Sequence, residues 1–103
     1  MNRIEQLRTF IETSPAEPFP RYALALELKG TGDAEACAAE FEALLSRAPD
    51  YLAAYLQYGM ILQALGQAEK AKAVLEQGQE LARKRGDSHT LSELTNALAA
   101  ASL

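Results

Sequence analysis

The sequence predicts an all-α fold of antiparallel helical hairpins, stacked as a short α-solenoid of about six helices. Three observations support this prediction. Twenty of the 103 residues are alanine, which has the highest helix propensity, whereas the chain has one valine and only three isoleucines. Capping residues, prolines and glycines divide the chain into segments with helical periodicity. Two similar stretches also follow each other 34 residues apart.

The first expected helix covers residues 3–13. Ile4, Leu7 and Ile11 fall on one of its faces, and Asn2 is placed to cap its amino end. The second helix is expected over residues 20–29, because Pro18 and the proline two residues later fit only a turn or a first helical turn.

Four further helices are expected over residues 34–47, 51–65, 68–85 and 88–101. Asp33 and Asp50 precede two of them as N-caps, and Gly86-Asp87-Ser88 ends one helix and begins the next. The cations of Arg83-Lys84-Arg85 suit the negative end of a helix dipole. Tight turns between these segments predict antiparallel neighbours.

The period of 34 residues joins positions of similar character. The pairs are Leu24 with Tyr58, Ala25 with Gly59, Leu28 with Leu62, Gly32 with Gly66, Cys37 with Ala71, and Phe41 with Leu75. Small residues at these positions, with Gly78 later in the repeat, are expected where paired helices come close, since a large side chain would force them apart.

This pattern resembles the tetratricopeptide repeat family over nearly the whole chain. The second repeat is similar to the family's aromatic-x2-Leu-Gly-x2-Tyr opening and its Ala-x3-Phe-x2-Ala stretch, through Tyr55, Tyr58, Gly59 and Leu62, then Ala71, Leu75 and Gly78. Three residues depart from the pattern. Arg21 replaces an aromatic residue, Leu44 replaces a small one, and Arg83 replaces a proline, which indicates a longer fifth helix.

The resemblance implies one domain over the 103 residues. Its expected parts are an N-terminal capping helix or half repeat over residues 1–17, a first repeat over 18–51, a second repeat over 52–86, and a C-terminal capping helix over 87–103. Terminal helices of this kind cover the last apolar face of a repeat array.

The family resemblance also implies a binding face, because the first helix of each repeat lines a concave groove. The corresponding positions here are Phe19, Tyr22, Leu26, Lys29, Ala53, Leu56, Met60 and Gln63. Members that hold a peptide's terminal carboxylate do so with Lys, Asn and Arg, and these mostly apolar positions do not match that clamp. We therefore expect a protein-interaction module with an apolar groove, or a structural domain that uses this face to self-associate as a homodimer. A third alternative is that the flanking terminal helices of the same chain cover this apolar face.

Composition argues against other classes of function. A net charge of −4 does not suit a general nucleic-acid or anionic-membrane binder. A single cysteine allows no internal disulfide, and neither a secretory signal nor a membrane-spanning run is expected, so we predict a cytoplasmic chain.

Few residues could carry catalysis, and we predict no enzyme, cofactor or metal. His89 is expected to pair with Glu93 one turn later on a solvated helix face. Cys37 occupies a packing position, where a buried and inert thiol is expected. The remaining candidates are expected on an outer face, in contact with water: Glu35, Glu40 and Glu42.

Overall fold

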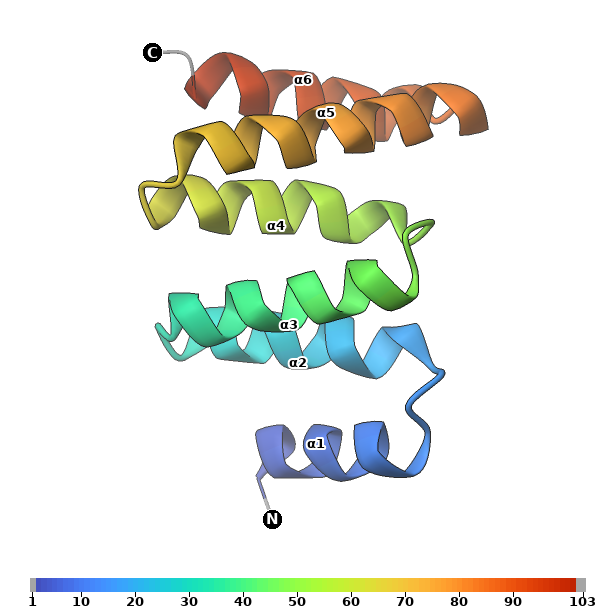
Figure 1. Cartoon of the computed structure of the whole chain (residues 1–103), viewed down its shortest axis with the longest axis vertical. Helices are drawn as coiled ribbons and strands as arrows, with labels where there is room; N and C mark the ends of the chain where they lie inside the picture. Colours follow the sequence, from blue (N-terminus) through green and yellow to red (C-terminus); the bar gives the residue numbers. More distant parts are fainter. Residues whose placement is uncertain (1, 102–103) are drawn as a thin grey trace. The chain divides into compact units, whose positions relative to one another are not determined.

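A computed structural model describes residues 2–101 as two compact units that divide between Pro49 and Asp50. The first unit contains α1 (Arg3–Thr13), α2 (Pro18–Gly30) and α3 (Ala34–Arg47). The second contains α4 (Leu52–Ala64), α5 (Ala68–Arg85) and α6 (Ser88–Ala101), as Figure 1 shows. No strand occurs among residues 2–101, so the predicted all-α fold is confirmed.

The helix starts of the first unit follow local capping chemistry. Asn2 Oδ1 accepts the backbone N–H of Glu5 at 2.9 Å, and Asp33 Oδ1 accepts that of Ala36 at 3.2 Å. Both caps were predicted. The predicted start of α2 was wrong by two residues, because Pro18 itself opens the helix, where a missing N–H removes no hydrogen bond.

The core of the first unit lies between α2 and α3, which are packed neighbours. Its fully buried large side chains are Leu24, Phe41 and Leu44. Cys37 is also fully buried, as predicted. By contrast, α1 packs on α2 with no fully buried residue of its own.

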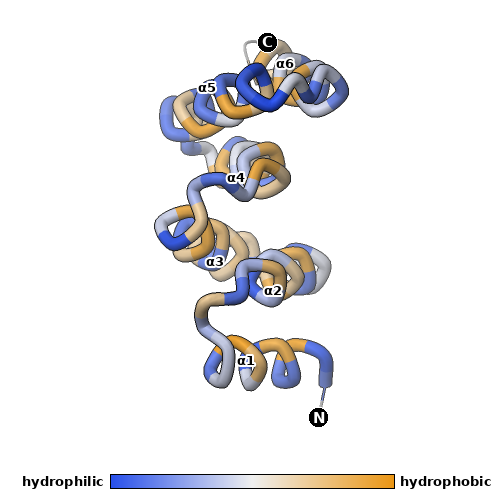
Figure 2. Tube along the Cα trace, turned by 90° about the vertical axis from the view of Figure 1, so that its right-hand side faces the viewer, coloured by the Kyte–Doolittle hydropathy of each residue, from blue (hydrophilic) through white to orange (hydrophobic). Residues whose placement is uncertain are grey.

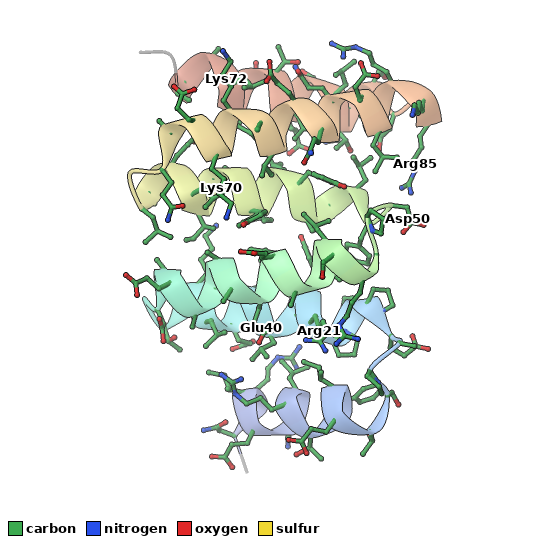
Figure 3. The ribbon with its side chains drawn as sticks, in the orientation of Figure 1. Arg21, Glu40, Asp50, Lys70, Lys72 and Arg85 are labelled. Carbon is green, nitrogen blue, oxygen red and sulfur yellow. The ribbon has the colours of Figure 1, made fainter. Side chains whose placement is uncertain are left out.

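One prediction for the first unit is corrected by an ion pair. Glu40 does not lie on an outer face, since its side chain is only 20% exposed and its carboxylate lies 3.6 Å from the guanidinium of Arg21. Figure 3 shows the two side chains meeting from α3 and α2. Arg21 occupies a position where the repeat pattern has an aromatic residue. Its guanidinium is accommodated there because the carboxylate of Glu40 lies beside it.

In the second unit, α4 begins at Leu52 after Tyr51, with no side-chain cap. The predicted cap at Asp50 was therefore wrong. The guanidinium of Arg85 donates a hydrogen bond to the main-chain oxygen of Asp50, and Figure 3 shows Arg85 reaching toward that segment. A contact with a residue 35 positions later leaves no signal in the local sequence.

The helices of the second unit approach closely at two glycines. Gly59 of α4 faces the buried Leu75 of α5. Gly78 of α5 lies between Tyr55 of α4 and Leu94 of α6, so that a Cβ built on it would lie 2.7 Å from Tyr55 Cβ and 3.0 Å from Leu94 Cδ2. Real Cβ contacts are longer, so both positions accept only glycine without rearrangement.

The turn between α5 and α6 was predicted correctly. Gly86 ends α5 with φ 66°, in the left-handed region, and Asp87 caps α6 by accepting the N–H of Thr90 at 3.0 Å. α5 has 18 residues against 14 in α3, which confirms the longer helix expected from Arg83. Both hydrophobic and hydrophilic residues follow one another along α5 in Figure 2, as in a helix with one buried face.

α6 packs against both α4 and α5. Leu94 at its centre is fully buried, whereas Leu91 and Leu98 are half-buried. None of the helices within residues 2–101 has the length and apolar character needed to cross a membrane.

Candidate functional site

The first unit places its predicted binding residues on one face of α2. Their spacings of three and four residues bring Phe19, Tyr22, Leu26 and Lys29 to the same side of the helix. Phe19 is 60% exposed, Leu26 is half-buried, and Lys29 is exposed. Because the ring of Phe19 is so exposed to water, it is available for a contact with another molecule.

Tyr22 differs from its neighbours on this face. Its ring centroid lies 6.0 Å from that of the fully buried Phe41, at an interplanar angle of 59°. Tilted rings at this separation attract one another. Tyr22 therefore also packs against the core of its hairpin, although it occupies none of the packing positions of the repeat pattern.

The second unit brings three of its four predicted residues together. Leu56, Met60 and Gln63 line a hollow of about 400 Å³ on the side of α4 that faces α6. We call this hollow the α4–α6 groove; its other lining residues, all from α6, are Glu93, Asn96, Ala97 and Ala100. Met60 is 41% exposed there.

The fourth residue, Ala53, lines a separate hollow of about 330 Å³ at the amino ends of α4 and α6. We call it the amino-end hollow; it is lined by Asp50, Tyr51, Leu52, Ala53, Arg85, Asp87 and Thr90. Three of these residues are charged, so this hollow is more polar than the α4–α6 groove. The second unit thus carries two hollows between α4 and α6, of which the amino-end hollow has more charged residues in its lining.

The contribution of α6 to this face was missed by sequence reasoning, which treated that helix as a cap. Gln63 Nε2 donates a hydrogen bond to the main-chain oxygen of Ala97 at 3.2 Å, across a separation of 34 residues. The repeat period applied once more to Ala53, Leu56 and Gln63 would have indicated Asp87, Thr90 and Ala97, which line the two hollows. It would have failed for Met60, because Leu94 is buried.

Carboxylates dominate the charge on this face. The Thr90 N–H and, to a smaller extent, the Thr90 hydroxyl lower the pKa of Asp87 by donating hydrogen bonds to its carboxylate. In the groove, the Glu93 carboxylate lies 3.4 Å from His89 Nε2, the pair expected from the sequence. Both side chains are open to water, at 47% and 87% exposure.

Other reactive groups lie apart from these hollows. Burial is the main effect on the Cys37 thiol and raises its pKa. Two charges have smaller effects on this pKa: Lys29 lowers it and Asp33 raises it. A thiol kept protonated in this way is a poor nucleophile. Within residues 2–101, no three His, Cys, Asp or Glu side chains lie close enough to share a metal ion.

Comparison with known proteins agrees with this architecture. Residues 28–100 match the family described as tetratricopeptide repeat. A crystal structure of a tetratricopeptide repeat domain protein from Salinibacter ruber is 37% identical, covers 84% of this chain and 97% of its own, and superposes with a TM-score of 0.79. A solution structure from the same organism and of the same description is 38% identical, covers 84% and 88%, and gives 0.78.

Two more distant structures share the fold. A protein from Bordetella parapertussis is 24% identical, with coverage of 99% and 89% and a TM-score of 0.83. The tetratricopeptide repeat domain of Sgt2 from Aspergillus fumigatus is 19% identical, with coverage of 96% and 63% and a TM-score of 0.81. None of the curated proteins compared with the chain matches it in sequence. The period, the close helix contacts and the match over residues 28–100 together show that the chain belongs to the tetratricopeptide repeat family.

Proposed function

We propose that the chain is a cytoplasmic protein-interaction module, organised as one domain with the repeat boundaries expected from its sequence. Domains of this family generally mediate contacts between proteins. The observation that carries the proposal is the α4–α6 groove, where Met60 is 41% exposed beside Leu56 and Ala97. A flexible, polarisable methionine in an open apolar hollow is typical of surfaces that adapt to a partner.

The exposed face of α2 supports the same function in the first unit. Phe19 is 60% exposed there, and Leu26 and Lys29 share its side of the helix. We propose that each first-helix face contacts a protein segment, through the eight positions expected from the sequence.

The proposal excludes catalysis and needs no cofactor. The fully buried thiol of Cys37 has its pKa raised by burial, so it is not poised for nucleophilic attack. His89 is 87% exposed, and its ion-pair partner Glu93 is also open to water, so the imidazole is not held in an enclosed site.

A photo-crosslinking capture tests the proposal at the groove. The chain carrying Met60→p-benzoylphenylalanine is incubated with an extract of the native host, irradiated, and analysed for crosslinked proteins. A matched probe at Glu76, exposed on α5, reports contacts that do not depend on the groove. We expect a protein crosslinked from position 60 and absent from position 76.

A groove variant provides the second half of this test. Leu56→Asp combined with Met60→Lys should abolish capture, because an unpaired charge in an apolar contact costs several kcal/mol. Since Leu56 is half-buried, the folded state is checked by circular dichroism, with Met60→Asp alone as the milder variant. A folded variant that captures every partner of the parent would eliminate this face.

Self-association is the second candidate, and the exposed phenylalanines of the first unit favour it. Phe10 is 51% exposed on α1 and Phe19 is 60% exposed on α2. Two large rings open to water suit a face that a second copy could cover. Solution mass measured over a range of concentrations decides between a monomeric adaptor and a homodimer, and Phe19→Asp should leave a monomer if α2 forms the contact.

A further inference from the structure

The α4–α6 groove has an uneven charge distribution. α4 contributes no charged residue between Leu52 and Ala64, and α6 carries only His89 and Glu93. Of these two, Glu93 lines the groove, beside the apolar side chains of Met60 and Ala97. Glu93 also lies 3.4 Å from His89 Nε2, but its side chain is 47% exposed, so a ligand there meets an apolar surface with a single accessible carboxylate at its edge.

The amino-end hollow adds charge of the same sign. It is lined by two carboxylate side chains, Asp50 and Asp87, and by one cation, Arg85. The guanidinium of Arg85 is already hydrogen-bonded to the main chain at Asp50. Along the face shared by α4 and α6, carboxylates therefore outnumber the available cations.

We propose that the α4–α6 groove binds a segment of another protein that places an apolar side chain against Leu56 and Met60 and a lysine or arginine beside Glu93. This inference rests on the proposed function, whose partner it describes more closely. An acidic segment would place like charges side by side, at a cost that suppresses binding. The preferred partner segment therefore carries positive charge, whereas a free carboxyl terminus would bring negative charge.

Another copy of this chain fits the groove less well. Its basic run, Arg83-Lys84-Arg85, has the required charge, but two of the three cations are engaged within the second unit. Arg83 lies 3.4 Å from the carboxylate of Glu80, and Arg85 donates to the main chain at Asp50. Binding through Arg85 would first require its hydrogen bond to the main chain at Asp50 to break, whereas the exposed pair of Arg83 with Glu80 is a smaller obstacle.

Three fluorescent peptides test the proposal on the full chain. The first repeats leucine and lysine at helical spacing; in the other two, every lysine is replaced by glutamine or by glutamate. Fluorescence anisotropy measures their affinities, and amide shifts in the ¹⁵N spectrum locate the site. We expect the lysine peptide to bind more tightly than the glutamine peptide and the glutamate peptide most weakly, with shifts in α4 and α6.

Variants of Glu93 separate local attraction from net charge. Glu93→Gln should lower the affinity for the lysine peptide by about threefold, which is the effect of losing one exposed ion pair. Glu93→Lys should lower this affinity further. Glu76→Lys makes the same change of net charge on the exposed side of α5 and should have a smaller effect than Glu93→Lys. Neither Glu93 variant should change the affinity for the glutamine peptide by more than about twofold.

The possible failures are distinguishable. If the lysine and glutamine peptides bind equally well and shift the same groove amides, the charge preference is refuted while the binding function stands. Equal weakening by Glu76→Lys and Glu93→Lys would also refute the preference. If no peptide shifts the amide signals of α4 or α6, the groove function itself fails. If the parent is a dimer in solution and Glu93→Lys is a monomer, the occupant of the groove is a second copy of the chain.

Discussion

Gly59 of α4 lies directly against Leu75 of α5. A Cβ built on Gly59 would stand 2.5 Å from Leu75 Cγ, and Leu75 is fully buried, so its side chain has no solvent to move into. The two residues belong to the small and large positions of the repeat pattern. Their contact explains why the sequence has glycine in the middle of a helix, where it otherwise costs about 1 kcal/mol relative to alanine.

Gly59→Ala should therefore destabilise the chain despite the better helix propensity of alanine. We expect a loss of about 1–3 kcal/mol in the free energy of unfolding, because Leu75 must leave its rotamer in a packed core. Urea denaturation followed by circular dichroism measures the loss.

Gly30→Ala is the matched control, because a Cβ at that helix end meets no atom within 4 Å. It should leave stability unchanged or raise it by up to about 1 kcal/mol. Equal stability of the Gly59→Ala variant and the parent would show that α4 and α5 are not held at this separation.

Leu94→Ala tests whether α6 is part of the fold. Leu94 is fully buried and lies against Gly78, so removing its side chain should cost about 2–5 kcal/mol. Asn96→Ala on the exposed side of α6 should cost less than about 0.5 kcal/mol. A chain that ends at Asp87 should lose cooperative unfolding or aggregate, and an unchanged melting curve would mean that α6 is a dispensable tail.

The thiol of Cys37 should react slowly in the folded chain. Burial holds the pKa of Cys37 above its ordinary value of 9.0, and the side chain is 0% exposed. Iodoacetamide at mildly alkaline pH should modify it at least about tenfold more slowly than in denaturant. Ala73→Cys in a Cys37→Ser background places a thiol on the exposed side of α5 as the control; equal rates at the two positions would contradict the burial of Cys37.

Features encoded within a few residues could be predicted from the sequence. The caps at Asn2, Asp33 and Asp87 and the left-handed stop at Gly86 depend on neighbours within one turn, and all four are confirmed. The spacing of small residues likewise predicted the contact at Gly59, because the 34-residue period fixes which helix faces meet.

Features that depend on residues far apart could not be predicted in this way. Asp50 looks like an N-cap locally, but the main chain there is fixed by Arg85, 35 residues later. Glu40 looks solvated until Arg21 is placed beside it. The contribution of Ala97 to the groove was missed because α6 was expected only to cap the array. The 34-residue period indicates Ala97 but fails at Leu94, which is buried.

The cap at Asp87 should make the stability of the folded state depend on pH in the acid range. Hydrogen bonds from Thr90 hold the pKa of Asp87 below its ordinary value of 3.8, so the folded state favours the carboxylate more than the unfolded state does. This stabilisation is complete above the ordinary value and is lost as the pH falls below it.

Asp87→Asn removes the titrating group and keeps the size of the cap. Melting temperatures are compared from about pH 6 to about pH 3, and the advantage of the parent over Asp87→Asn should shrink toward the acid end. Glu76→Gln, on an exposed side chain, should show a difference that is smaller and less dependent on pH. A constant advantage of the parent at every pH would mean that Asp87 acts through its shape and not through its charge.

The ion pair between Arg21 and Glu40 allows a test of what two mostly buried charges contribute to the stability of the first unit. Their side chains are 13% and 20% exposed, and the two charged groups lie 3.6 Å apart. Among residues 2–101, no side chain or main-chain group makes a hydrogen bond with Arg21 Nε or Glu40 Oε2, so desolvation of these atoms is only partly offset.

Glu40→Met alone should destabilise by about 1–3 kcal/mol, because Arg21 is left half-buried without its counter-charge. Arg21→Met combined with Glu40→Met should recover most of that loss, since apolar side chains of similar volume often replace a buried pair without cost. The double-mutant cycle, measured by urea denaturation, isolates the coupling between the two residues. Additive losses in the double variant would show that the pair contributes no coupling and that each side chain is held by its own packing.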